Sequence, residues 1–110
     1  MGKGKSDLLH GTLELLVMKL LEHESLNGYT IGQRIKSVTD EALSVDEGSL
    51  YPALYRMERY GWLSASWGRS ENNRRAKFYS LTADGRKQLG LERSNWADFS
   101  KAVAKILESA

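Results

Sequence analysis

Apolar residues recur at helical spacing along most of the chain, which predicts a mainly helical domain. The first segment, residues 8–21, has leucines at the spacing of one buried face, namely Leu9, Leu13, Leu16 and Leu20. A second segment, residues 29–38, follows the Asn27-Gly28 turn signal and carries Ile31, Ile35 and Val38 at the same spacing. The stretch that comes next, Leu43 to Val45, is long enough only for a short connecting strand.

The third segment, residues 46–60, has two contrasting faces. Leu50, Leu54 and Met57 form an apolar stripe with Ala53 beside it, and Asp46 stands at the N-cap position. The opposite face has tyrosine and arginine where a solvated helix usually has glutamate and lysine. Its members, with the flanking positions, are Gly48, Ser49, Tyr51, Pro52, Tyr55, Arg56 and Arg59. A proline past the first turn costs about 3 kcal/mol in an ordinary helix, and such broken rules concentrate at functional sites.

A β-hairpin with a basic tip is predicted after Gly61, which ends the third helix. The segments from Trp62 to Trp67 and from Ala76 to Leu81 are rich in aromatic and β-favouring residues, and the polar stretch between them forms the loop. We expect both tryptophans to pack the hairpin against the helices, with a place near a nucleic acid as the alternative for Trp67.

The last predicted helix, residues 83–107, would be about 37 Å long, and Thr82 can cap its start. Its apolar seam consists of Leu89, Trp96, Phe99, Val103 and Ile106. Little else in one chain can cover this seam, so a two-fold dimer is predicted. The chain then divides into residues 1–81, which hold the first three helices and the hairpin, and a C-terminal dimerisation helix, residues 82–110.

Composition excludes several classes of protein. The chain has 110 residues, 41% apolar and 27% charged, which is typical of one small globular domain. It has no cysteine, no apolar run long enough for a membrane span and no signal-peptide pattern, so we expect a cytoplasmic protein. We expect no metal, no cofactor and no enzymatic activity, since no ligand cluster, nucleophile motif or phosphate loop is present.

Positive charge is concentrated in one part of the chain. Residues 61–90 hold six cations and two anions, whereas residues 1–60 hold seven cations and nine anions. This asymmetry indicates a polyanionic partner. Three helices followed by a basic hairpin are the order of a winged helix-turn-helix, in which one helix enters the major groove of double-stranded DNA. The predicted fold class is therefore mainly α with a small β-hairpin.

Two longer motifs resemble the PadR family of bacterial transcriptional regulators. One runs from Glu47 to Glu58 and contains Leu50-Tyr51-Pro52, and the other runs from Arg74 to Thr82 and ends the hairpin. The opening stretch from Leu9 to Leu13 and the Gly28-Tyr29 pair are also similar to that family. Nearly the whole chain is covered, and the single C-terminal helix resembles the short-tailed branch.

The resemblance implies a homodimer that binds an inverted-repeat operator and usually represses. Recognition-helix contacts would fall on Ser49, Tyr51, Pro52, Tyr55 and Arg56, and wing contacts on Arg74, Arg75, Lys77 and Tyr79. In the short-tailed branch the dimer interface can enclose small aromatic effectors. Trp96 with Phe99 would then be an effector platform, although the residue pattern favours plain packing within the dimer seam.

A protein-interaction module is the competing class of function, because exposed tyrosine and arginine can also anchor a protein partner. A small-molecule sensor is a third hypothesis, and it extends the repressor. Salt dependence discriminates the first two classes, since binding to phosphates weakens steeply as ionic strength rises.

Overall fold

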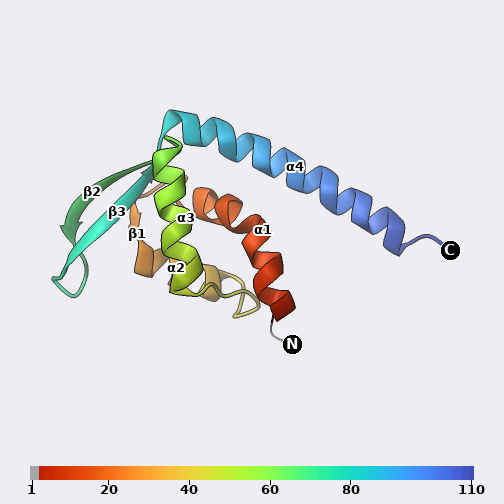
Figure 1. The fold of residues 1–110 in the computed structure, drawn as a ribbon, viewed down its shortest axis with the longest axis horizontal. Helices are drawn as coiled ribbons and strands as arrows, with labels where there is room; N and C mark the ends of the chain where they lie inside the picture. Colours follow the sequence, from red (N-terminus) through yellow and green to blue (C-terminus); the bar gives the residue numbers. More distant parts are fainter. Residues whose placement is uncertain (1–2) are drawn as a thin grey trace.

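The computed structural model describes residues 3–110, with side chains from Thr12 onward. Four helices and a three-stranded antiparallel sheet make up the fold (Figure 1), which confirms the predicted winged-helix class. In chain order the elements are α1 (Lys3–Leu20), β1 (Leu26–Asn27), α2 (Gly28–Val38), α3 (Glu47–Arg59), β2 (Leu63–Arg69), β3 (Arg75–Leu81) and α4 (Ala83–Leu107).

The sheet has one strand that the sequence pattern did not predict. Its order is β1-β3-β2, and β1 pairs Leu26 with Tyr79 and Asn27 with Phe78. The predicted strand from Leu43 to Val45 is wrong, because that stretch has no strand and its apolar side chains pack half-buried against the core. Two residues are too few for a period-2 pattern, so only long-range pairing with β3 identifies β1.

The hairpin is longer than predicted. Its ladder continues to the pair Arg69 and Arg75, and only residues 70–74 form the loop. Asn73 adopts a left-handed conformation with φ of 60°, which lets the chain reverse in this short loop. The basic side chains on both sides of the loop are therefore held on regular strands.

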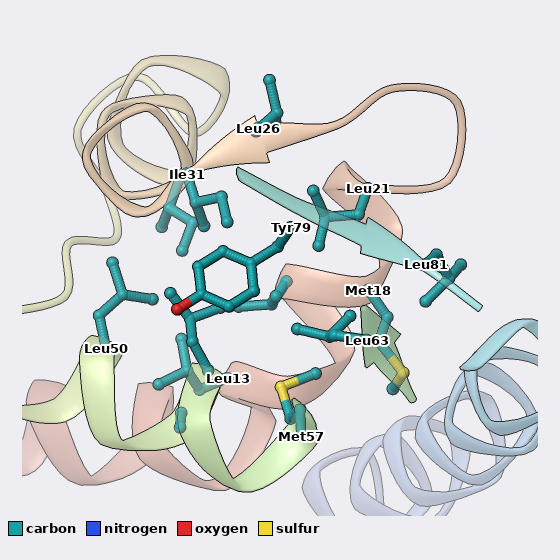
Figure 2. Packing of buried hydrophobic residues seen from close by; sticks show 14 of the residues in the cluster. Leu13, Met18, Leu21, Leu26, Ile31, Leu50, Met57, Leu63, Tyr79 and Leu81 are labelled. Carbon is teal, nitrogen blue, oxygen red and sulfur yellow. The ribbon is translucent and has the colours of Figure 1, made fainter. Parts of the chain in front are cut away.

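The hydrophobic core lies between α1, α2, α3 and the sheet (Figure 2). From α1 it takes Leu13, Val17 and Met18, and Leu21 directly after the helix is buried with them. The predicted stripe on this helix is therefore displaced, since Leu16 and Leu20 are only half-buried and Leu9 lies outside the described side chains. In α2 Ile31 and Ile35 are buried as predicted, but Val38 is 68% exposed. The leucine-rich helix α1 has more than one apolar stripe, and packing selects among them.

The starts of α2 and α3 differ in their capping. The Asn27 side chain accepts a hydrogen bond from the Thr30 amide at 2.8 Å. Asp46 stands at the predicted N-cap of α3 but makes no side-chain capping hydrogen bond. We expect Asn27→Ala to lower the free energy of unfolding by about 1 kcal/mol and Asp46→Ala to lower it less. Urea denaturation of both variants measures this difference, and equal losses would contradict the assignment.

Helix α4 begins on the body of the domain and its C-terminal half extends away from it (Figure 1). The Thr82 hydroxyl accepts from the Gly85 amide, which confirms the predicted cap. Leu89, predicted as part of the dimer seam, is buried in the core of its own chain. Only the part of the seam beyond Leu89 is therefore available to a second molecule.

Candidate nucleic-acid interface

Helix α3 has the two faces that its sequence predicts. Its apolar side chains, Leu50, Ala53, Leu54 and Met57, are buried in the core. Tyr51, Pro52, Tyr55 and Arg59 are exposed on the opposite side, and the helix continues through the proline without a break. Gly48 is exposed and Ser49 half-buried in the first turn. The Arg59 guanidinium lies 5.8 Å from the centre of the Tyr55 ring. This exposed face combines hydrogen-bond donors with aromatic surface, as a nucleic-acid contact requires.

Arg56 differs from the other predicted contacts on α3. Its Nη2 donates to the Glu14 carboxylate on α1 at 3.3 Å, with both side chains partly exposed. The carboxylate offsets part of the positive charge that the sequence alone assigns to a DNA contact. Arg56 therefore acts mainly as a link between α1 and α3.

A groove of about 910 Å³ separates the start of α2 and α3 from the hairpin. Tyr51 lines it from α3, and Arg74, Arg75 and Lys77 line it from the hairpin side. The structure thus brings Tyr51 of one motif into the same groove as Arg74 of the other, 23 residues further along the chain. The groove also includes Trp67, for which a place near a nucleic acid was the alternative expectation. Four further lining residues were not predicted as contacts, namely Tyr29, Thr30, Arg34 and Arg69.

Charge in the groove is predominantly positive. Five cations and two carboxylates, Glu24 and Glu71, line it. The Arg34 guanidinium donates to the Glu24 carboxylate at 3.0 Å, so this cation is paired within the chain. In the part of the chain whose side chains are described, no salt bridge joins Arg74 or Arg75 to a carboxylate. Arg69, which also lines the groove, has no such salt bridge either, so three arginines there keep their charge without a carboxylate partner among the described side chains.

Lys77 and Tyr79 have roles that the sequence did not reveal. The Lys77 ammonium donates to Glu58 on α3 at 2.9 Å, and this hydrogen bond raises the pKa of Lys77. Tyr79 is 6% exposed and its ring points into the core (Figure 2). The expectation of a side-chain DNA contact at Tyr79 is therefore corrected. Alternation along β3 puts both residues on the face toward α3, where Lys77 ties the hairpin to that helix.

Trp67 does not pack the hairpin against the helices as expected. It is 58% exposed, and the Arg75 guanidinium lies over its ring at 4.3 Å from the ring centre. Trp62, in contrast, is half-buried against the core, with its ring 4.9 Å from that of Tyr60. The contact between Trp67 and Arg75 could have been predicted from the alternation of side chains along the strands, because both residues lie on the same face of the hairpin. Stacking on the indole holds the Arg75 guanidinium in the groove.

The Tyr51 phenol has a constrained environment at the other side of the groove. Burial raises its pKa, and the nearby Glu47 carboxylate raises it further. The hydroxyl therefore stays protonated and can donate a hydrogen bond to an anionic oxygen.

A second surface lies on α4, beyond Leu89. Large apolar side chains stay exposed there, with Phe99 at 60% and Ile106 at 73%. The exposed set is Leu91, Trp96, Phe99, Val103, Ile106 and Leu107. The Trp96 and Phe99 ring centres lie 6.0 Å apart. Monomeric proteins rarely expose so long an apolar stripe.

Two other kinds of site do not occur in the described part of the chain. Between residues 12 and 110 no three histidine or acidic side chains are grouped so that they could hold a metal ion. Among the helices of residues 3–110, none has the length and apolarity needed to cross a membrane.

Solved structures of known proteins resemble this chain over nearly its full length. A transcriptional regulator from Clostridium thermocellum is 28% identical, with a TM-score of 0.85 over 94% of this chain and 100% of that chain. A PadR-like transcriptional regulator from Bacillus cereus is 26% identical, with a TM-score of 0.80 over 96% of this chain and 100% of that chain. A PadR family regulator from Eggerthella lenta is 30% identical, with a TM-score of 0.78 over 94% and 88% of the two chains.

The family model of the transcriptional regulator PadR-like family matches residues 17–91, which is more than half of the chain. Its members are DNA-binding transcriptional regulators rather than enzymes, in agreement with the expectation from the sequence. The matched region contains α3, the groove and the complete hairpin. This chain belongs to the PadR-like family of transcriptional regulators.

Proposed function

We propose that the protein is a homodimeric repressor that binds an inverted-repeat operator. The observation that carries this proposal is the groove that Tyr51 lines together with Arg74 and Arg75, neither of which has a salt bridge to a described carboxylate. Helix α3 would enter the major groove with its exposed face, and the two arginines would contact the adjacent backbone. Because its ligand is DNA, the protein would act in the cytoplasm.

The contacts assigned to this interface follow from exposure and charge. On α3 they are Gly48, Ser49, Tyr51, Pro52, Tyr55 and Arg59, and on the hairpin Arg74 and Arg75. Arg56 and Lys77 have carboxylate partners, so we assign them mainly to positioning α3 and the hairpin. The described side chains thus divide into those that meet DNA and those that orient the elements.

The dimer is proposed from the exposed part of the α4 seam. Two chains related by a two-fold axis would cover each other's stripe from Trp96 to Ile106. Their recognition helices would then lie about one turn of DNA apart, roughly 34 to 36 Å. Within the seam, the Trp96 and Phe99 rings supply the stacking surface for a small aromatic effector, the hypothesis that the family resemblance raised.

Selection of bound duplexes from a random DNA pool tests this function. A two-fold symmetric consensus is expected, and its affinity should fall steeply with salt concentration. Arg75→Ala should weaken binding to all sequences and lower the slope of log affinity against log salt by about one. Lys101→Ala, which removes a cation from the exposed surface of α4, is the matched control. Binding that is insensitive to salt, or no enrichment at low ionic strength, would overturn the proposal in favour of a protein partner.

A further inference from the structure

Gly28 lies directly beneath the Tyr51 ring. A β-carbon built on Gly28 would stand 2.5 Å from Cε1 of Tyr51, 3.0 Å from Cζ and 3.1 Å from the hydroxyl oxygen. Real β-carbons essentially never approach a non-bonded heavy atom of another segment within 3.0 Å. Any residue other than glycine would therefore displace the ring.

The backbone of Gly28 does not itself require glycine. This residue opens α2, and its φ lies outside the left-handed region where side chains are strained. The need for glycine comes from the neighbouring ring alone. The Asn27 side chain caps the same helix start by accepting from the Thr30 amide, so the surface on which the ring rests is fixed.

This contact joins two motifs of the sequence. The Gly28-Tyr29 pair opens α2, and Leu50-Tyr51-Pro52 lies in α3. Both Gly28 and Tyr51 line the groove that faces the hairpin arginines. The ring is 42% exposed, so one part of it touches α2 while the rest remains open to a ligand.

We propose that Gly28 is a positioning residue for DNA binding: its missing side chain lets the Tyr51 ring rest on the first turn of α2 and hold its hydroxyl toward a phosphate in the groove. The inference rests on the proposed function. Tyr51 is the residue that contacts DNA, and Gly28 acts only through it. An alanine at position 28 would push the hydroxyl out of place while leaving every charge in the groove unchanged.

A double-mutant cycle tests the inference with a fluorescently labelled duplex carrying the selected consensus. Tyr51→Ala should raise Kd roughly tenfold, the loss expected for a hydrogen bond to a charged oxygen. Gly28→Ala should raise Kd by a similar factor. In the Tyr51→Ala protein, however, Gly28→Ala should change Kd by less than about twofold, because the ring that it displaces is absent.

Gly32→Ala is the matched control, since it makes the same substitution in the same helix. A β-carbon at Gly32 would meet only the Leu50 side chain, at an ordinary contact distance of 3.5 Å. Its Kd should stay within about twofold of the wild type. Equal losses from Gly28→Ala with and without the Tyr51 ring would overturn the inference, because the effect would then come from the fold of α2.

A second measurement does not depend on DNA. In NMR spectra of the wild type, the Tyr51 ring should shift the Gly28 α-proton resonances, and Tyr51→Ala should remove that shift. Tyr51→Phe should keep the shift and still lose the affinity. Wild-type affinity in Tyr51→Phe would overturn the inference even if Gly28→Ala does not fold. A wild type that binds no duplex but shows the shift would place the failure in the proposed function and leave the Gly28 contact intact.

Discussion

Replacing Gly85 with alanine is expected to destabilise the domain by roughly 3 kcal/mol, the upper end of the cost of overpacking a core. A β-carbon at this position would lie 2.1 Å from the Trp62 carbonyl oxygen and 2.6 Å from Cδ1 of Leu81. The closest of these atoms belongs to the backbone, which cannot rotate away as a side chain can. The first turn of α4 would have to separate from the start of β2.

That separation would break several hydrogen bonds at once. The Thr82 hydroxyl donates to the Gly61 carbonyl at 2.7 Å, and the Thr82 amide donates to the Trp62 carbonyl at 3.0 Å. The same hydroxyl accepts from the Gly85 amide at 2.9 Å. Together these bonds fasten α4 to the turn between α3 and β2. Leu89, one turn further along α4, would leave the core with it.

Urea denaturation measures the loss, and Gly90→Ala is the matched control in the same helix. Nothing lies within 4 Å of a β-carbon at Gly90, so this variant should be neutral or stabilised by up to about 1 kcal/mol through helix propensity. Equal unfolding midpoints for the two variants would contradict the packing described for Gly85.

Phe99→Glu is expected to make the protein monomeric at micromolar concentration. The Phe99 ring is 60% exposed in the middle of the α4 stripe, and in the proposed dimer it would be buried against the partner. A carboxylate in its place would lose its hydration without gaining a partner, which is far more costly than the loss of a methylene group. Sedimentation equilibrium measures the result directly.

The affinity of Phe99→Glu for the operator should fall because the dimer is lost. A monomer engages one half-site, and without the linkage between two sites the affinity drops by about 100-fold or more. Ser94→Glu adds the same charge on the opposite side of α4 and should leave both the mass and the affinity unchanged. A wild type that is itself monomeric would contradict the proposed dimer. A Phe99→Glu protein that remains dimeric would show that α4 does not form the interface.

The sequence predicted those elements whose pattern is local and long. Residues 83–107 form the last helix with the predicted boundaries and the predicted cap at Thr82, because 25 residues of helical periodicity leave little ambiguity. The buried stripe of α3, from Leu50 to Met57, was predicted for the same reason. The short strand β1 and the displaced face of α1 were not, since each depends on contacts with distant parts of the chain.

The candidate site was predicted in part. The residue types at the candidate interface were predicted because tyrosine and arginine are unusual on the exposed face of a helix. Tyr51 and Tyr55 are the clearest examples. The salt-bridge partners of the cations could not be predicted, because the sequence does not show which carboxylate lies beside which cation. Glu14 for Arg56 and Glu58 for Lys77 are both contacts between separate elements.

By itself the sequence determined the order of the elements, the two faces of α3 and the basic hairpin, because all three depend on neighbours within a few turns of the chain. Only the tertiary structure decided which of the predicted contact residues are exposed and without a partner inside the chain. It buried Tyr79 and Leu89, paired Lys77 with Glu58, and laid the Tyr51 ring on Gly28. Burial and pairing arise from close packing of segments far apart in sequence, and no local periodicity encodes them.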